Sequence, residues 1–411
     1  MKKNSLFNPS TNSIINTKIN CPLCYHNNTE KILVLTTGNF DQSILYDKIR
    51  IYTCLDCGHV FNHLSTDELK NLTNYYTEEK SLTNANSQEK NGDLPGSNNP
   101  RTIERYQKLF DFIKKYLPLK AQVLDIGFSK GGFNKFLGKL DYKNLFDLDV
   151  VDNCLGKALP MDLNSIADNS LDCLVMDQVM EHLTEPVKAF EEARRVLKLG
   201  GILCLGVPDA NRYNENHFFD FYWFLLREHL QHFDLAHVNL LAAKTNFELI
   251  DNMVSDLAMM SETMIMPNLN IIFKLGNKPI KKIKLNNNFE LVKKIKKCLA
   301  DDLVRLKGRR KFFSHLAKKQ QPLYVWGMSR EFFYLYEAAG LKYCNIKGLI
   351  DTNPYKQRCL KIDGRSIQPE GILKQTHQSD RLLITATAHS DPIETKLKQG
   401  GCEIGFINLK K

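Results

Sequence analysis

The chain has 411 residues, 43% of them hydrophobic and 25% charged, and its formal net charge is +10. This length allows two or three domains of ordinary size. A membrane span is excluded because no apolar run reaches the roughly 18 residues that it needs. The polar N-terminus also lacks the apolar core of a secretory signal. We therefore expect a cytoplasmic protein.

The positive charge is concentrated in one segment of the sequence. Residues 274–319 hold 16 Lys and Arg against 3 Asp and Glu. The rest of the chain is consequently slightly acidic. The basic isoelectric point therefore does not by itself indicate a nucleic-acid partner.

Composition and motif positions divide the chain into six parts. The polar stretch over residues 80–100 lacks hydrophobic periodicity, which is typical of a linker. We expect a flexible tail over 1–20, a zinc-binding module over 21–70, a linker over 71–100, an α/β domain over 101–275, a basic helical connector over 276–320 and a smaller α/β domain over 321–411.

Two C-x2-C pairs, separated by 29 residues, are formed by Cys21, Cys24, Cys54 and Cys57. Paired cysteines in a chain without an export signal favour metal over disulfides. Residues 32–36 and 48–52 have the pattern of strands, so the segment resembles a zinc ribbon. Four thiolates would hold a structural Zn²⁺ with no open position; the alternative is four unrelated buried thiols. We expect His59 to be a bystander.

Strand and helix patterns alternate through the larger α/β domain. This alternation predicts a parallel sheet with ligands at the carboxyl ends of its strands. The expected elements are a helix over Ile103–Leu117, strands over Gln122–Ile126 and Ser170–Met176, a helix over Pro186–Leu199 stopped by two glycines, and a strand over Ile202–Val207.

A glycine-rich turn follows the first of these strands. Gly127 and Gly131 allow the backbone to approach a ligand closely, and the next helix N-terminus favours a carboxylate. The stretch 123–133 resembles motif I of class I S-adenosylmethionine-dependent methyltransferases, with Ser129 in place of the middle glycine. Segments 177–183 and 193–201 follow in the order typical of that family. The resemblance covers roughly residues 101–250 and implies a Rossmann-like sheet and S-adenosylmethionine as cofactor.

The same resemblance implies roles for several acidic residues. Asp149, 22 residues after Gly127, would bind the ribose hydroxyls, although Asp147 and Asp152 compete for that role. Asp162 matches the residue that meets the adenine. The short gap between Asp149 and Asp162 predicts a missing or reduced helix. The candidate cofactor residues are Asp125, Gly127, Ser129, Gly131, Asp149, Asp162 and Asp177.

Residues 227–233 resemble a segment of sugar C-methyltransferases, which join a zinc module, a methyltransferase domain and a C-terminal nucleotide-fold domain in this order. The resemblance implies that His229 is the base that removes a proton beside a ketone, assisted by Glu228. Alternatively, both side chains merely pack. Tyr75 and Tyr76 match tyrosines that line the sugar site, or they pack as well. The candidate substrate residues are Tyr75, Tyr76, His182 and His232.

The C-terminal part has the pattern of a small Rossmann-like unit. Strands are expected at 322–326, 344–351 and 381–387, but only Gly327 remains of a dinucleotide fingerprint, so NAD binding is not expected. Ser329 and Arg330 either hold a phosphate at a helix N-terminus or lie at the surface. The basic segment has helical spacing. We interpret it as a solvated connecting helix, with membrane, nucleic acid or a diphosphate as alternative contacts.

The leading hypothesis is a methyltransferase of carbohydrate biosynthesis that transfers a methyl group from S-adenosylmethionine to a carbon of a nucleotide-linked keto sugar. Proton removal would precede methyl transfer, and the protein would mainly supply alignment and a base. The alternatives are a zinc-ribbon RNA base methyltransferase, which suits the basic segment, and a non-catalytic cofactor-binding scaffold.

Overall fold

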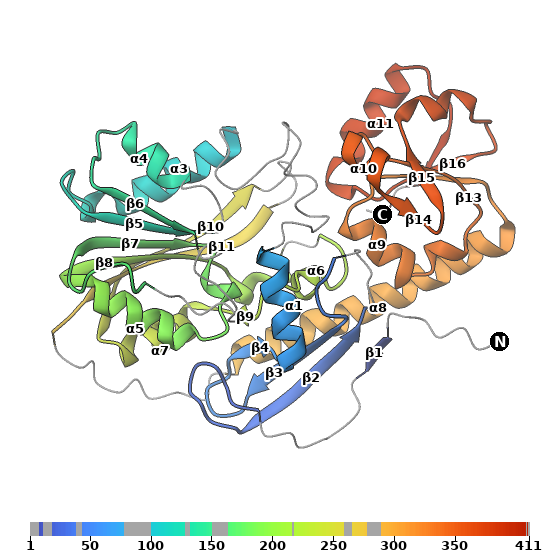
Figure 1. Ribbon diagram of the computed structural model, residues 1–411. Coiled ribbons are helices and arrows are strands. Elements are labelled where there is room, and N and C mark those ends of the chain that lie inside the picture. Colours follow the sequence, from blue (N-terminus) through green and yellow to red (C-terminus); the bar gives the residue numbers. More distant parts are fainter. Residues whose placement is uncertain are drawn as a thin grey trace.

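The computed structural model describes residues 8–10, 19–37, 43–77, 100–127, 132–149, 163–215, 218–258, 265–277, 289–407 and 409. These residues form three sheets, of five, six and six strands (Figure 1). The five-stranded sheet contains the N-terminal segment, and each six-stranded sheet belongs to one of the two α/β domains. None of the described helices is long and apolar enough to cross a membrane.

The sheet of the larger α/β domain has the strand order β10-β11-β8-β7-β5-β6. Strands β6, β5, β7 and β8 run parallel, and β11 is antiparallel to both β8 and β10. This confirms the expected Rossmann-like parallel sheet. The strands are β5 (Val123–Gly127), β6 (Leu145–Asp149), β7 (Leu171–Asp177), β8 (Leu197–Pro208), β10 (Phe247–Ala258) and β11 (Ile265–Leu275).

Helices cover both faces of this sheet (Figure 1). Side chains alternate along each strand, so Cys173 and Val175 pack in one cluster while Leu174 and Met176 pack in the other. The helices are α3 (Pro100–Ile113), η1 (Lys114–Tyr116) and α4 (Gly132–Gly138) on one face, with α5 (Pro186–Val196) and α7 (Leu235–Lys244) on the other.

Helix α5 ends earlier than the sequence predicts. It stops at Val196, and β8 begins at Leu197. The two glycines expected to end the helix instead lie within β8, where the register with β7 shifts between Leu171 and Cys173. Gly200 has φ of 82° there, a conformation that favours glycine. The expectation of a helix to residue 199 is therefore wrong because these glycines form a bulge in a strand.

The N-terminal sheet is completed by a distant part of the chain. Its order is β1-β2-β3-β4-β9, and β4 pairs with β9 through Val60 opposite His232. Thus the N-terminal module is joined to the segment that carries Glu228 and His229. Its elements are β1 (Asn8–Ser10), β2 (Thr29–Thr36), β3 (Lys48–Cys54), β4 (Val60–Asn62), β9 (Gln231–His232) and α1 (Thr66–Thr77).

Helix α1 occupies the start of the stretch 71–100 that the sequence predicts to be a linker. Residues 78–99 lie outside the described residues, as do most of the tail 1–20 and the stretch 150–162, where a reduced helix was expected.

The C-terminal domain has the strand order β14-β15-β13-β12-β16-β17, with only β14 antiparallel to its neighbour. Its helices are α9 (Arg330–Glu337), η5 (Leu341–Tyr343), α10 (Pro354–Cys359), η6 (Glu370–Gln375), η7 (Thr387–His389) and α11 (Ser390–Gln399). Its strands are β12 (Leu323–Trp326), β13 (Ile346–Ile350), β14 (Lys361–Ile362), β15 (Arg365–Gln368), β16 (Arg381–Ile384) and β17 (Gly405–Ile407).

Asp351, directly after β13, is occupied by contacts within this domain. Its carboxylate accepts a hydrogen bond from the Met328 backbone N–H at 2.8 Å and pairs with Lys356 at 3.0 Å. An acid at the end of the second strand is the usual ribose ligand of a dinucleotide fold. In this domain Asp351 instead fixes the turn after β12 and the start of α10.

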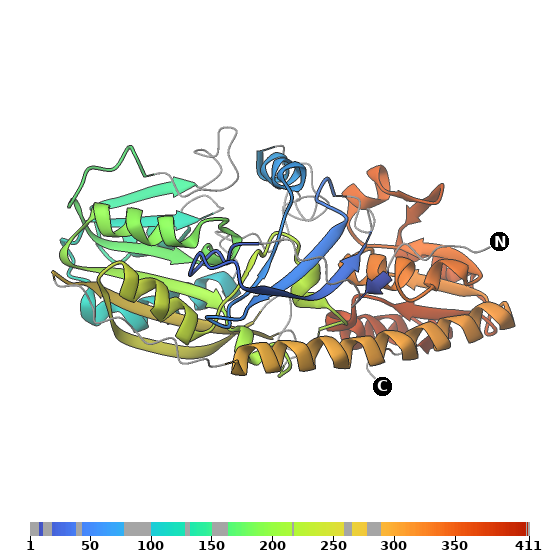
Figure 2. The ribbon, with the colours of Figure 1, turned by 90° about the horizontal axis from the view of Figure 1, so that it is seen from below.

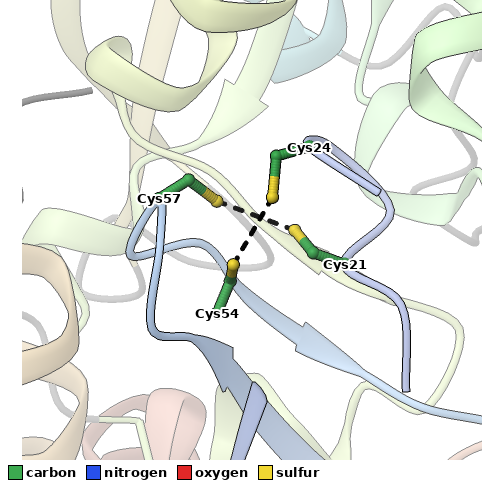
Figure 3. Close-up of side chains that lie close together, drawn as sticks. All are labelled: Cys21, Cys24, Cys54 and Cys57. Carbon is green, nitrogen blue, oxygen red and sulfur yellow. Dashed lines mark hydrogen bonds between the residues drawn. The ribbon is translucent and has the colours of Figure 1, made fainter. Parts of the chain in front are cut away.

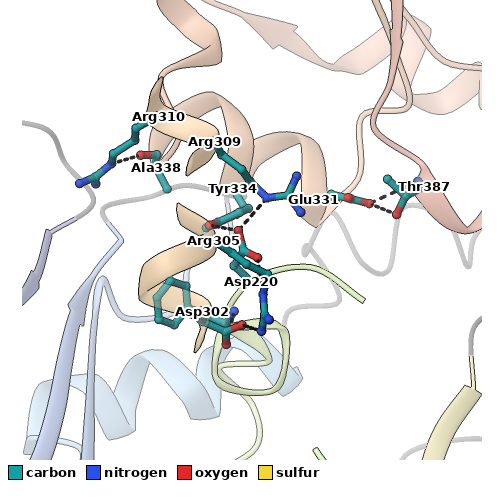
Figure 4. A network of polar contacts seen from close by, with 10 residues as sticks. Asp220, Asp302, Arg305, Arg309, Arg310, Glu331, Tyr334, Ala338 and Thr387 are labelled. Atoms are coloured by element: carbon teal, nitrogen blue, oxygen red, sulfur yellow. Dashed lines mark hydrogen bonds and ion pairs between the residues drawn. The ribbon is translucent and has the colours of Figure 1, made fainter. Parts of the chain in front are cut away.

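Helix α8 (Glu290–Lys319) is a long helix that runs beneath the N-terminal sheet and the C-terminal domain (Figure 2). The fully buried Asp220 joins it to the C-terminal domain. Arg309 on α8 contacts Asp220 at 2.7 Å, Arg305 contacts it at 3.2 Å, and the Tyr334 hydroxyl of α9 donates to it at 2.7 Å (Figure 4). A buried carboxylate requires such partners, so this network fixes α8 and α9 against the segment before α6 (Tyr222–Leu225).

Candidate active site and cysteine cluster

The four predicted cysteine ligands come together (Figure 3). Their sulfurs lie close in two pairs, Cys21 with Cys57 at 3.6 Å and Cys24 with Cys54 at 3.5 Å. Sulfurs that share a tetrahedral metal through bonds of about 2.3 Å are about 3.8 Å apart. The cluster can therefore hold one tetrahedral metal ion.

His59 takes no part in the cysteine cluster. Its Nε2 lies 2.9 Å from Gln231 Oε1, and its ring packs against Phe233. His237, which the sequence did not single out, supports the cluster instead. Its Nε2 is 2.9 Å from the Cys57 carbonyl oxygen and its Nδ1 is 2.6 Å from Asp234.

Several predicted cofactor residues end neighbouring strands of the larger sheet. Gly127 ends β5 and is in register with Asp149, which ends β6. Asp177 ends β7 beside Gly206. These strand ends form one edge, where a ligand of a Rossmann-like sheet binds. Ser129, Gly131 and Asp162 lie outside the described residues, and only the backbone of Asp149 is described.

Asp177 is held by a residue that the sequence analysis missed. Arg105 of α3 contacts Asp177 Oδ2 through Nε at 3.0 Å and through a terminal guanidinium nitrogen at 2.5 Å. The carboxylate lies over Gly206, where an added Cβ would be 2.0 Å from Oδ1. Asp177 Oδ1 has no hydrogen-bond partner in the described structure. A single arginine on an amphipathic helix gave no signal for this pairing.

Three carboxylates gather at this edge. Burial, together with the charges of Asp147 and Asp177, raises the pKa of Asp125 to about 7. The repulsion between these groups means that a cation placed among them is favoured. A positively charged group of a ligand would therefore be favoured beside Asp125.

The predicted substrate residues also come together. The rings of His182 and His229 meet edge to face with centroids 4.7 Å apart. Tyr76 from α1 places its hydroxyl 2.9 Å from His182 Nδ1, and the same nitrogen is 3.1 Å from the carbonyl oxygen of Glu228. Tyr75 packs against Tyr76 with ring centroids 5.4 Å apart. His182 belongs to η3 (Met180–His182), which follows β7 at the carboxyl edge of the sheet.

Glu228 receives a partner from the C-terminal domain. Arg330, the first residue of α9, donates to Glu228 Oε1 at 2.9 Å. The other carboxylate oxygen, Oε2, has no hydrogen-bond partner among the described residues. From the sequence, Arg330 is expected either to hold a phosphate or to lie at the surface, because no local pattern places α9 beside residue 228.

Burial sets the protonation of these histidines. It lowers the pKa of His182 to about 4 and that of His232 to about 3. Burial and the neighbouring His182 also hold the pKa of His229 well below its usual value. All three imidazoles are therefore neutral near pH 7, and each keeps a nitrogen lone pair. His232 lies in β9, with Nδ1 3.3 Å from the Tyr213 hydroxyl.

The N-terminal module holds the segment that carries these residues. Arg227 is fully buried and donates to the carbonyl oxygens of Leu45 and Tyr46. The Tyr46 hydroxyl donates back to the Arg227 carbonyl oxygen at 2.5 Å, and Asn62 Nδ2 donates to the His229 carbonyl oxygen at 2.9 Å. The cysteine-containing sheet thus positions the backbone on both sides of Glu228.

Comparison with known proteins found similarity to one part of the chain. Residues 100–252 match the family described as a methyltransferase domain. An uncharacterized 37.1 kDa protein of a Streptomyces fradiae transposon is 48% identical over 44 residues. That match covers 11% of this chain and only 13% of the transposon protein.

Solved structures that are similar to part of this chain include a methyltransferase from Methanosarcina mazei that depends on S-adenosylmethionine. It has 19% identity and a TM-score of 0.32, with 41% of this chain and 98% of that chain covered. Another is an N-methyltransferase from Bradyrhizobium japonicum in complex with S-adenosyl-L-homocysteine, with 16% identity, a TM-score of 0.33, and coverage of 46% and 93%. The family match marks residues 100–252 as similar to a methyltransferase domain, and the strand order of the larger sheet gives this part of the chain a Rossmann-like fold.

Proposed function

We propose that the chain methylates a carbon of a nucleotide-linked keto sugar, with S-adenosylmethionine as methyl donor. One observation carries this proposal: a neutral imidazole pair, a tyrosine and a carboxylate meet at the carboxyl edge of the methyltransferase sheet. A base is needed to form a carbon nucleophile beside a ketone, and a neutral histidine suits that task. The neighbouring C-terminal domain contributes Arg330 and would frame the rest of the acceptor.

His229 is the proposed base. Its imidazole takes a proton from the carbon next to the ketone, and the carboxylate of Glu228 assists as the site gains positive charge. Tyr76 and His182 orient the acceptor, Tyr75 supports Tyr76, and His232 contributes from β9. The remaining work of the protein is alignment of the acceptor carbon with the methyl donor.

The residues at the carboxyl edge fit S-adenosylmethionine. Asp125 and the unpartnered Oδ1 of Asp177 would meet its ammonium end, and Gly127 allows close approach. By position, Asp149 would bind the ribose and Asp162 the adenine. Ser129 and Gly131 would contact the cofactor from the glycine-rich turn. When bound, the cofactor supplies an activated methyl group.

The cysteine cluster is the proposed site of a structural Zn²⁺ ion, because four thiolates at these distances complete a tetrahedron. We also propose that the chain works as three units: the cysteine module, the methyltransferase domain and the C-terminal Rossmann-like domain, with α8 as the connector.

The first test is isothermal titration of metal-analysed protein with S-adenosylhomocysteine. Micromolar binding that is lost in Asp149→Ala supports the cofactor site. If folded, zinc-containing protein does not bind S-adenosylhomocysteine, the proposal is contradicted and the hypothesis of a non-catalytic scaffold is favoured.

The second test follows hydrogen exchange in D₂O at the carbon beside the ketone, in a panel of nucleotide-linked keto sugars. Wild-type protein is expected to catalyse exchange, and His229→Asn is expected to lose it. Tyr25→Phe, at an exposed position, is the control. Equal exchange by wild type and His229→Asn would rule out His229 as the base.

A further inference from the structure

Three metal-ligating side chains form a second cluster, separate from the cysteines. Glu181, His182 and His229 are all buried, and one ligand atom from each lies within 4.8 Å of the other two. Glu181 is only 1% exposed. No sequence pattern singles out Glu181, because the group is completed only by His229, which lies far away in the sequence.

The backbone around this cluster is fixed before any ligand arrives. The Leu230 N–H donates to the Glu181 carbonyl oxygen at 2.7 Å, which joins η3 to the segment after His229. Asn62 holds the His229 carbonyl oxygen from β4. The cluster is therefore assembled from two loops that the N-terminal sheet ties together.

His182 is oriented as metal-bound histidines usually are. Its Nδ1 is 3.1 Å from the Glu228 carbonyl oxygen. The Tyr76 hydroxyl lies 2.9 Å from the same nitrogen and can donate or accept, so Nε2 keeps the lone pair in the tautomer in which Nδ1 donates to the carbonyl oxygen. That Nε2 lies 3.9 Å from Glu181 Oε1. A backbone carbonyl on the far nitrogen is a common way to set the tautomer of a histidine ligand.

Several atoms of the cluster have no hydrogen-bond partner in the described structure. Both carboxylate oxygens of Glu181 and Nδ1 of His229 are buried and unpartnered. Burial of an unpaired polar group costs several kcal/mol as an order of magnitude, and native structures rarely leave such groups unsatisfied. A cation bound between Glu181 and His229 would give buried polar atoms of both residues a partner.

We propose that Glu181, His182 and His229 bind one divalent transition-metal ion of the Zn²⁺ type. Two imidazoles and one carboxylate suit such ions and leave positions open for water or a ligand oxygen. Ligand atoms that share an ion through bonds of about 2.1 Å are about 3.4 Å apart at tetrahedral angles. The observed distance between Glu181 and His182 thus needs only a small side-chain rotation.

Metal binding has a consequence that rests on the proposed function. An ion on His229 Nδ1 uses the lone pair of a neutral imidazole and leaves the other nitrogen protonated. The loaded form cannot use His229 as a base. Micromolar metal is therefore expected to inhibit methyl transfer, and a chelator that leaves the cysteine site filled is expected to restore it.

The test uses Co²⁺ as the probe, added to protein whose cysteine cluster already holds one equivalent of Zn²⁺. A second equivalent is expected to bind with visible ligand-field bands but without thiolate-to-cobalt charge transfer, because the ligands are nitrogen and oxygen. Glu181→Gln and His229→Asn should each weaken this binding by at least about 10-fold.

Glu185→Gln is the matched control, because Glu185 is a half-buried carboxylate four residues further along the chain and is paired with Lys188. It should bind Co²⁺ as wild type does. Thermal melts confirm folding of each variant, and His229→Asn serves if Glu181→Gln does not fold. Absence of a second equivalent in wild type, or undiminished binding in the folded variants, would overturn the site. If the wild-type protein binds the second equivalent of Co²⁺ but transfers no methyl group while that site is empty, only the proposed function is contradicted.

Discussion

The four thiols of the cysteine cluster come from two tight turns at one end of the N-terminal sheet, whereas the candidate active site takes side chains from all three parts of the chain. Tyr76 comes from α1, His182 and His229 come from the methyltransferase region, and Arg330 comes from the C-terminal domain. A ligand set within one short motif is visible in a sequence. A site assembled across domains becomes visible only when the domains are placed together.

The largest effect is expected when the cysteine cluster is disrupted and the consequences are measured at the candidate active site. Cys54→Ser should abolish metal binding and unfold the module, since structural zinc contributes on the order of 10 kcal/mol. The segment held by Arg227 and Asn62 should then become more mobile. The variant should therefore also lose the ability to exchange the hydrogen on the acceptor carbon beside the ketone, a reaction that does not require the cofactor. Metal analysis and hydrogen–deuterium exchange of residues 227–232 are the measurements.

The exposed Cys359 offers the control for that variant. Cys359→Ser should leave metal content and protection of residues 227–232 unchanged. If Cys54→Ser lost its metal but kept that protection, the cysteine cluster and the active site would be independent of each other.

A change confined to the active site should leave the cysteine cluster intact. His229→Asn is expected to lower the rate of methyl transfer about 10²- to 10⁴-fold, the range typical of a lost general base. Its zinc content should match wild type. A steady-state assay with a methyl-labelled donor measures the rate, and a loss under about threefold would contradict the proposed role.

The buried histidines predict a loss of stability in acid. The pKa of His182 is lowered to about 4 in the folded protein, against about 6.5 unfolded. Below pH 6.5 the His182 imidazole is protonated in the unfolded chain but stays neutral in the folded chain. The free energy of unfolding therefore falls as the pH drops from 6.5 toward 4. At pH 5 the loss from His182 is about 2 kcal/mol.

Urea unfolding at pH 7.5 and 5 measures this effect. His182→Gln should have a smaller difference between the two pH values than wild type has. The exposed His26→Gln should behave as wild type. Identical pH dependence in all three proteins would show that His182 is not buried as a neutral group.

The smallest expected effect concerns the contact between domains. Arg330→Gln removes the partner of Glu228 but leaves the base in place, so kcat should fall about 10-fold, near 1.4 kcal/mol, while zinc content and cofactor affinity stay constant. Arg330→Lys should recover part of the rate and shift its pH profile less than Arg330→Gln does. If both variants transfer methyl groups at the wild-type rate, Arg330 does not contribute to the reaction.

The sequence predicted the elements whose signals are local. The cysteine pairs, β2, β3, β5, β7 and the helical spacing of α8 all depend on neighbouring residues, and the structure places them near the expected positions. The two glycines at the start of β8 were misread because a glycine pair marks a helix end and a bulge equally well.

The parts that the sequence could not supply depend on long-range contacts. Arg105 on Asp177, Arg330 on Glu228 and Asn62 on His229 each join residues far apart in the chain. Nothing in the local pattern distinguishes these side chains from ordinary surface residues. The two-residue strand β9 is likewise too short for any periodicity.

Strand β9 also sets an order for assembly during synthesis. Strand β4 is complete at Asn62, yet the strand that covers its open edge ends at His232. At 5 to 20 residues per second, translation takes roughly 10 to 30 seconds to reach it. During that interval the nascent module presents an unpaired edge, the feature that promotes wrong pairing between chains. Early metal binding by the cysteines would stabilise the incomplete sheet until β9 has been synthesised.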